Sequence, residues 1–377
     1  MFLLLAISVF PLIEAQACQV PVFRYALENW PAYPFRLTMF HRGPLTASQK
    51  EAFEWLPKEG ATPTIPVNVI VNDVDLIKPD PVAAGLWSIQ GNPELPWVVV
   101  EFPHQDQIAG SAWSGKLDRD IIKSLVDSPA RRELARRLLR GDSAVWVLVQ
   151  KNNAQAAQTV ASVEAELRKL ETTLKLPNPE QGTESKSTPS GLKTPLKIGF
   201  STIHVGEDDP AEKVFLQILR KTSRHPVPSD AVVVGYPVFG RGRCLGGYAG
   251  ADLAPQAIEK ECAFIVGACS CQVKSENPGV DLPMLVNWDE FVKGSMPVSK
   301  AMPSLTSLMP VAPITSAAAS GTQASSAPSE IPISKTTEAT PPAPPQREPL
   351  KLSIFAVLGI AAVFVVGCTL FIWRKPR

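Results

Sequence analysis

Three cysteines fall within ten positions of the chain, and their thiols have the widest chemical range of any residues in it. The stretch reads CAFIVGACSCQVK and holds Cys262, Cys269 and Cys271, while Cys244 precedes it. Clustered thiols suit a disulfide, a soft-metal site or a redox centre. The choice depends on the compartment, because thiols outside the cytoplasm tend to oxidise.

One or two structural disulfides among Cys244, Cys262, Cys269 and Cys271 are the interpretation that we favour. Four thiols allow three pairings, and the sequence does not choose among them. A metal site is the second interpretation. The spacing Cys-x6-Cys-x-Cys is not a standard zinc spacing, so a soft ion such as Cu(I) would suit these thiolates better. Redox-active thiols are the third, since no Cys-x-x-Cys is present to lower a thiol pKa. We predict no cofactor, no catalytic residue and no resident metal.

The two ends of the chain indicate where these thiols reside. Residues 2–13 are almost wholly apolar and Ala15-Gln16-Ala17 has a small-x-small pattern, so we expect a signal peptide over residues 1–17. Residues 352–373 carry no charge, and as a helix they would be about 33 Å long, enough to cross a bilayer. The basic tail 374–377 marks the cytoplasmic side. We expect one membrane span with the bulk of the chain outside the cytoplasm.

Cys18 stands directly after the expected cleavage site. Acylation of its thiol is one alternative, but Ala15 and Gln16 depart from the residues that a lipoprotein signal carries. We therefore expect plain cleavage before Cys18.

The amino-acid composition indicates how the rest of the chain is divided into folded domains and linkers. The formal charge of +1 provides no attraction to nucleic acid. Residues 295–350 are rich in Pro, Ser, Thr and Ala without an aromatic residue, which is typical of a disordered stalk. A Pro/Ser-rich linker at 176–195 is expected to separate a first α/β domain at 18–175 from a second at 196–294.

The two halves resemble each other. FRLTMFHRGPL from Phe35 and KIGFSTIHVGEDDP from Lys197 each combine an apolar run with His-x-Gly, and an amphipathic helix follows. VVVEFP and VVVGYP then recur, each ahead of a glycine and a helical pattern. We interpret this as a duplication that places His41 and His204 at matching strand ends, with Asp208 or Asp209 capping the second helix.

Capping residues predict the ends of two further helices. Ser128 and Pro129 open ARRELARRLL, whose five arginines we expect to be solvated. The helix from about Ala254 should place Cys262 on its inner face and end at Gly267.

ELPWVVVEFP, SAWSGKLDRDIIKSLV and NVIVNDVDL together resemble the thioredoxin-like fold over residues 35–127. The resemblance implies a cis bond before Pro96 and a dithiol near residues 41–44, where this chain has His-Arg-Gly-Pro. CQVPVFRYALENWPAYPF, YPVFGRGR and CSCQVKSENPGVDL resemble uncharacterised exported, membrane-anchored proteins of planctomycete-type bacteria. That family implies no known activity.

The sequence therefore predicts an α/β chain of two degenerate thioredoxin-like repeats, a stalk and one transmembrane helix. We expect a non-catalytic scaffold, sensor or accessory protein of the cell envelope, held in the membrane and working beside other envelope proteins. The alternative is a thiol-redox or soft-metal handling protein that uses the cysteine cluster.

Overall fold

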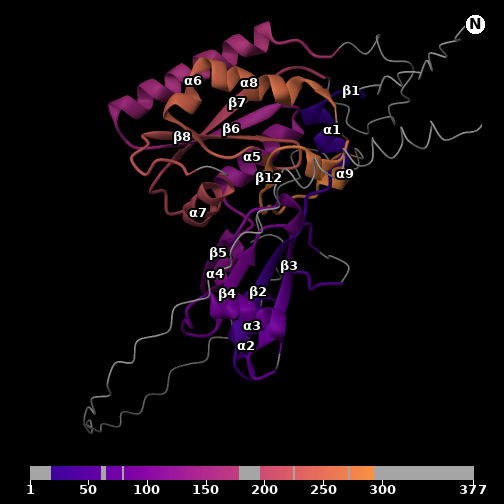
Figure 1. Ribbon diagram of the computed structural model, residues 1–377, viewed down its shortest axis with the longest axis vertical. Helices are drawn as coiled ribbons and strands as arrows, with labels where there is room; N and C mark the ends of the chain where they lie inside the picture. Colours follow the sequence, from indigo (N-terminus) through magenta and orange to yellow (C-terminus); the bar gives the residue numbers. More distant parts are fainter. Residues whose placement is uncertain are drawn as a thin grey trace, which may run out of the picture. The chain divides into compact units, whose positions relative to one another are not determined.

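The computed structural model describes residues 18–60, 65–78, 80–177, 196–223, 226–270 and 272–292. These ranges fold into a mixed α/β structure with several β-sheets (Figure 1). The expected signal peptide, stalk, membrane span and basic tail lie outside the described residues, as do Cys271 and most of the linker. None of the helices in the described ranges combines the length and apolar composition needed to cross a bilayer.

The strands are β1 (Cys18–Pro21), β2 (Phe35–His41), β3 (Val69–Asp75), β4 (Trp97–Glu101), β5 (Ser111–Lys116), β6 (Ala144–Gln150), β7 (Phe200–Gly206), β8 (Val233–Phe239), β9 (Arg243–Cys244), β10 (Tyr248–Ala249), β11 (Ala268–Cys269) and β12 (Val280–Asp281). The α-helices are α1 (Val22–Asn29), α2 (Ala47–Phe53), α3 (Pro81–Ser88), α4 (Arg119–Ser124), α5 (Pro129–Leu139), α6 (Ala154–Thr173), α7 (Lys213–Thr222), α8 (Pro255–Val266) and α9 (Trp288–Val292). Short 3-10 turns include η1 (His104–Asp106), η3 (Gly250–Leu253) and η4 (Lys274–Glu276).

The first lobe is the four-stranded sheet β3-β2-β4-β5 with its helices. β2 pairs with β3 in parallel and with β4 antiparallel, and β5 is antiparallel to β4. β3, β4 and β5 fall where the sequence predicts strands. The expected cis bond is confirmed between Leu95 and Pro96, just ahead of β4.

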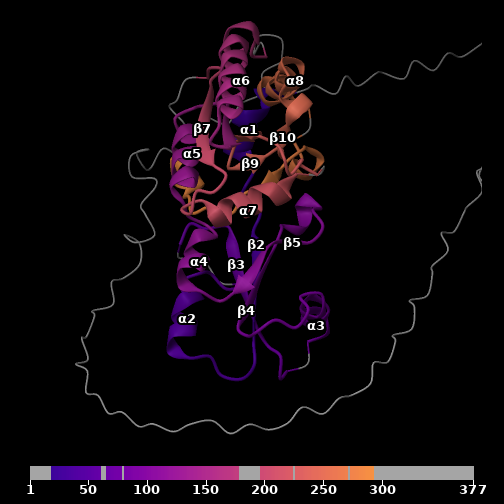
Figure 2. The same cartoon turned by 90° about the vertical axis from the view of Figure 1, so that its left-hand side faces the viewer.

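The two faces of the first sheet are covered unequally. α2 and α4 pack on one face over a core that includes Phe35, Leu37 and Val98. Among the described helices, only the short α3 packs on the other face, over Phe40 and Val99. Figure 2 shows α2 and α4 on one side of these strands and α3 on the other. The described helices therefore leave part of this second face uncovered.

The second lobe is the six-stranded sheet, in the order β12-β9-β8-β6-β7, with β10 also paired to β8. β6 reads AVWVLVQ, and its odd-numbered valines face α5 and α7 whereas Trp146 and Leu148 face α6 and α8. This alternation buries both faces of the strand, which explains its continuous apolar run. Figure 1 shows α6 and α8 on one side of the sheet and α5 and α7 on the other.

The division into domains differs from the expected one at both ends. β6 and α6 were assigned by sequence to the first domain, 18–175, yet β6 lies between β7 and β8 in the second sheet. β1 and α1 also belong with the second lobe, because β1 pairs with β11 and α1 packs in the core around Cys262. The first lobe is thus inserted between an N-terminal segment and the rest of the second lobe.

The correspondence between the strands of the two lobes differs by one strand from the one expected from the sequence. β2 has a parallel neighbour, β3, and an antiparallel neighbour, β4; in the second sheet β6 is the strand with such neighbours, β7 and β8. The sequence pattern matches the segment of β2 with the segment of β7 as equivalent strands of the two repeats. This correspondence is wrong, because β7 is an edge strand whereas β2 lies inside its sheet. The match of VVVEFP with VVVGYP agrees with the sheets, since β4 and β8 hold equivalent positions.

Helix α7 begins later than its expected caps. Its N-cap position is Glu212, and the Asp209 carboxylate instead accepts from the backbone N–H of Ala211 in the preceding turn. α5 begins as predicted, with the Ser128 hydroxyl accepting from the N–H of Arg131. The expected solvation of its arginines is wrong for Arg131, which is 1% exposed because its guanidinium stacks over the Phe215 ring.

Candidate functional site

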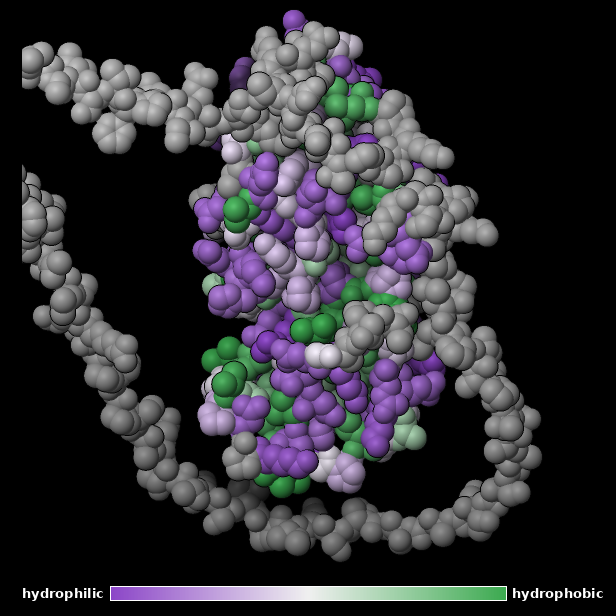
Figure 3. Space-filling model, turned by 90° about the vertical axis from the view of Figure 1, so that its right-hand side faces the viewer, coloured by the Kyte–Doolittle hydropathy of each residue, from purple (hydrophilic) through white to green (hydrophobic). Residues whose placement is uncertain are grey.

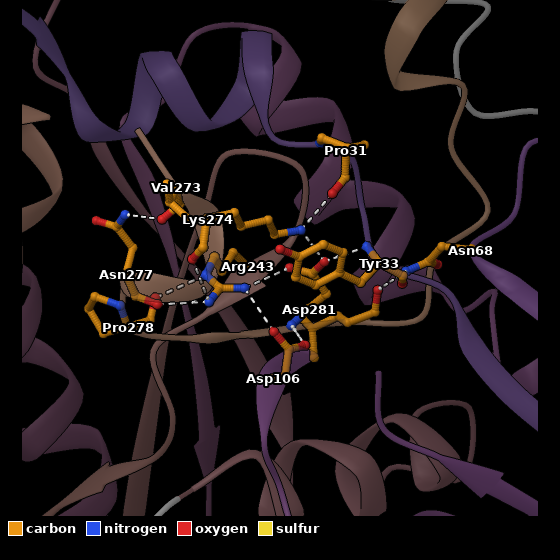
Figure 4. Close-up of polar contacts among 11 residues, drawn as sticks. Pro31, Tyr33, Asn68, Asp106, Arg243, Val273, Lys274, Asn277, Pro278 and Asp281 are labelled. Atoms are coloured by element: carbon orange, nitrogen blue, oxygen red, sulfur yellow. Dashed lines mark hydrogen bonds and ion pairs between the residues drawn. The ribbon is translucent and has the colours of Figure 1, made fainter. Parts of the chain in front are cut away.

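Three distant stretches of the chain meet where the first lobe joins the second (Figure 4). They are the segment after α1, the strand β9 with its preceding turn, and the segment from η4 to β12. η1 of the first lobe completes the site by inserting Asp106. The side chains at its centre are those of Tyr33, Asp106, Arg243, Lys274 and Asp281.

Arg243 is the central cation of this junction cluster. Its Nη1 lies 3.1 Å from Asp106 Oδ1 and 3.2 Å from Asp281 Oδ1. Its Nε donates to the carbonyl of Pro278 at 2.9 Å, and its Nη2 donates to the carbonyls of Asn277 at 2.9 Å and Lys274 at 3.5 Å. All three guanidinium nitrogens are therefore engaged with acceptors, which a buried arginine requires.

Lys274 is the second cation. Its Nζ forms an ion pair with Asp281 Oδ2, donates to the carbonyl of Pro31 and lies 3.8 Å from the centre of the Tyr33 ring. The backbone N–H of Tyr33 donates to the same Asp281 oxygen at 2.6 Å. Two cations and two carboxylates balance, so the cluster is buried without net charge.

Burial governs the electrostatics of the cluster. The side chains of Asp106, Arg243 and Asp281 are at most 3% exposed. Burial, followed by the neighbouring Asp281 charge, raises the pKa of Asp106, whereas Arg243 and the N–H of Asp281 oppose the rise. Burial disfavours the charged form of Lys274 as well, and therefore lowers its pKa. These groups are enclosed and fully hydrogen-bonded, so the cluster fixes the structure and offers no accessible acid or base.

The junction cluster also holds one wall of a surface groove. The loop around η1 contributes His104, Gln105, Gln107 and Ile108 to a hollow of about 750 Å³ on the open face of the first sheet. Asp106 lies within that loop and points into the cluster. The adjoining hollow of about 630 Å³ shares Arg36, Leu86, Ile89 and Glu101 with the first, so the two form one groove.

The groove mixes apolar and hydrogen-bonding side chains. The sheet supplies Arg36, Thr38, Asn72 and Glu101, and Arg36 pairs with Glu59 at 3.3 Å. α3 and its C-cap residue supply an apolar rim, in which Val82 is 80% and Ile89 74% exposed. Figure 3 shows the space-filling surface of one side of the molecule as neighbouring hydrophobic and hydrophilic patches. None of the described residues that line the groove is a cysteine.

His41 ends β2 at the corner where the thioredoxin-like resemblance implies a dithiol. Its Nε2 lies 2.9 Å from Asp73 Oδ1 and its Nδ1 2.6 Å from the carbonyl of Gly43. Asp75 accepts from the N–H groups of Gly43 and Ile77, and these bonds lower its pKa. His41 is therefore tied into a turn, as expected of a strand-end residue.

His204 lies elsewhere, on the edge strand β7, with its Nε2 2.9 Å from Glu164 Oε1. The two histidines do not occupy equivalent positions.

The structure separates the cysteines that the sequence places together. Cys244 lies in the cluster with α5 and α7, whereas Cys262 lies in the cluster with α6 and α8, so the second sheet stands between them. Cys262 is on the inner face of α8, which ends at Gly267 as predicted. Burial raises the pKa of the Cys244 thiol to about 11 and raises that of Cys262 as well.

Cys269 lies on the Cys262 side of the sheet, at the end of β11. Cys244, Cys262 and Cys269 are not joined to one another by a disulfide in the described part of the chain. Across those same residues, no group of three or more His, Cys, Asp or Glu side chains is arranged to hold a metal ion. Cys271, the fourth candidate, lies outside the described residues, and Cys18 is the first residue of β1.

No family model, curated protein or solved structure matches this chain. The geometry of its own residues therefore carries the functional argument. The junction cluster was not predicted, because its members are separated by up to 248 positions along the chain. A signal was nevertheless present: Tyr33, Arg243, Lys274 and Asp281 all fall within the three stretches that carry the resemblance to exported proteins.

Proposed function

We propose that this chain is a non-catalytic scaffold or accessory protein, anchored by residues 352–373 with its folded part outside the cytoplasm. Its two lobes are degenerate thioredoxin-like units that keep the architecture and have lost the dithiol. They present a binding groove to other proteins of the cell envelope. The observation that carries the proposal is the groove: it is open, it is lined by hydrogen-bonding and apolar side chains, and no described thiol lies in it.

The order of each sheet supports the thioredoxin-like interpretation. In both lobes a central strand has one parallel and one antiparallel neighbour, and a further antiparallel strand follows. In the second lobe, helices cover both faces of the sheet, as in a layered α/β unit. The corner of the first lobe that would carry the dithiol holds His41 and Gly43 instead.

The state of the thiols argues against the redox alternative. A reactive cysteine needs an exposed thiolate in an electropositive setting. Cys244 is fully enclosed, with its Sγ 3.7 Å from the Thr222 hydroxyl, and burial raises its pKa. Cys262 is 0% exposed. Neither thiol can act as a nucleophile while the fold is intact.

The joint between the lobes supports a scaffold as well. The Trp113 indole donates to Gln217 at 2.9 Å and Lys221 donates to the carbonyl of Ser111, so α7 is bonded to β5 across the junction. Together with the Asp106–Arg243 pair, these contacts hold the groove in a fixed position on the second lobe. A preformed groove binds without the ordering cost of a flexible surface.

Thiol counting and metal analysis on the full-length protein in detergent test this proposal. We expect Cys244 and Cys262 to resist an aromatic disulfide reagent in the native protein and to react after unfolding, with no stoichiometric metal. Rapid native labelling of either residue, or one bound soft metal ion per chain, would instead support the thiol or metal alternative. Cys244→Ala and Cys262→Ala assign each labelled site.

A further inference from the structure

The N-terminal strand β1 pairs with β11 to form a separate two-stranded antiparallel sheet. The register places the backbone of Cys18 opposite that of Cys269. A hydrogen bond from the N–H of Val22 to the carbonyl of Gly267, at 2.9 Å, holds the neighbouring end of this pairing. Residues 251 positions apart are thus brought to one register position.

Opposed positions in an antiparallel pair suit a covalent link. Their Cα atoms lie about 4.5–5.5 Å apart, which falls inside the range of about 4.4–6.8 Å found across disulfides. Cys244, by contrast, stands opposite Val238 and Val280, and Cys262 lies within a helix. Of the cysteines in described strands, Cys18 and Cys269 are the pair that register brings together.

We propose that a disulfide joins Cys18 to Cys269. The two thiols together lose two protons and two electrons, and a disulfide-bearing thiol oxidoreductase accepts them as its own disulfide opens to two thiols. The pairing rests on the proposed location outside the cytoplasm, where such oxidants operate. It also excludes acylation of Cys18, because one sulfur cannot form both a thioether to lipid and a disulfide.

The link ties the N-terminal segment to the second lobe. β1 leads directly into α1, whose Val22, Phe23 and Ala26 are buried in the core around Cys262. α1 is followed by Trp30, whose indole donates to the carbonyl of Gln272, close to Cys269 in sequence. A disulfide at the start of β1 would hold the first residues of a segment that is otherwise anchored through α1 and Trp30.

Peptide mapping tests the link. The full-length chain is isolated from its own membranes with N-ethylmaleimide present at lysis, and trypsin is applied without reductant. The peptide that ends at Arg24 holds Cys18, and residues 261–274 hold Cys262, Cys269 and Cys271. We expect these two peptides to be joined, with fragmentation placing the bond at Cys269. Cys269→Ser should abolish the link and Cys271→Ser should preserve it.

A second sample separates the pairing from the compartment. Full-length protein is purified in detergent under reductant and then transferred to a glutathione redox buffer. A link that forms in the buffer but is absent from cells would retain the pairing and count against the extracytoplasmic location. N-ethylmaleimide on Cys18 in cells, combined with no link in the buffer, overturns the pairing. A diacylglyceryl adduct on Cys18, or a bond to Cys271, overturns it as well.

Discussion

Asp106 Oδ1 lies 3.1 Å from Arg243 Nη1, and these two side chains, from different lobes, are 0% and 3% exposed. Asp106 also accepts from the backbone N–H of Asp281 through its other oxygen. A surface loop of the first lobe is therefore bonded into the interior of the second. Removing one member of such a buried pair leaves an uncompensated charge, which costs far more than the intact pair contributes.

Replacing Asp106 should destabilise the protein strongly. In Asp106→Ala, Arg243 and Lys274 would face Asp281 alone, so the cluster would hold an unbalanced positive charge. We expect the free energy of unfolding to fall by about 3–5 kcal/mol. Urea denaturation of the full-length protein in detergent, followed by tryptophan fluorescence, measures the change.

The matched control is an exposed ion pair. Glu94 and Lys116 both lie at the surface, with side chains 76% and 65% exposed. Glu94→Ala should leave the unfolding midpoint almost unchanged, because solvent screens such pairs. Equal losses for Asp106→Ala and Glu94→Ala would contradict the role given to the junction cluster.

Two carboxylates should give opposite pH dependences. Backbone N–H groups of Gly43 and Ile77 lower the pKa of Asp75 below its usual 3.8, so its stabilising contribution is present above 3.8 and lost as the pH falls through the folded-state pKa. Burial raises the pKa of Glu212 above its usual 4.5, so its contribution is complete below 4.5 and lost as the pH rises through the folded-state pKa.

Thermal unfolding from acid to neutral pH distinguishes the two groups. The deficit of Asp75→Asn relative to the parent protein should grow as the pH rises through the window below 3.8. Any deficit of Glu212→Gln should shrink as the pH rises through the window above 4.5. Parallel curves for both variants would refute these assignments.

Gly240 should resist substitution more than a glycine of similar backbone conformation. Its φ is +58°, and a Cβ added there would lie 2.7 Å from the Cβ of Ala26 in α1. Gly91 has a φ of +75° and nothing within 4 Å of its added Cβ. Because overpacking costs about 1–3 kcal/mol beyond the shared backbone strain, Gly240→Ala should lose that much more stability than Gly91→Ala. Urea titration compares the two variants, and indistinguishable midpoints would show that α1 moves without cost.

The sequence predicts local elements well because their signals are local. Ser128 with Pro129 identifies the start of α5, and Gly267 identifies the end of α8. ELPWVVVEFP and NVIVNDVDL, two of the stretches that resemble the thioredoxin-like fold, identify β4 and β3. Each of these signals lies within a few residues of the element that it marks.

Partner choice was not predictable in the same way. AVWVLVQ reads as a buried strand in either lobe, and only its pairing with β7 and β8 assigns it to the second. Similarly, Cys244 and Cys262 are only 18 positions apart, yet the sheet between them prevents a shared site. Strand order and side of the sheet arise from contacts that spacing along the chain does not encode.

The insertion of the first lobe has a consequence for synthesis. The N-terminal strand emerges from the ribosome first, yet its partner Ala268–Cys269 and the acceptor Asp281 of Tyr33 follow almost at the end of the folded region. Because synthesis runs from the N-terminus, the first lobe can complete its own sheet while β1 and α1 still await their neighbours. The second lobe can be completed only when β11 is synthesised and pairs with β1. Its assembly is therefore a late step that depends on contacts between residues far apart in the sequence.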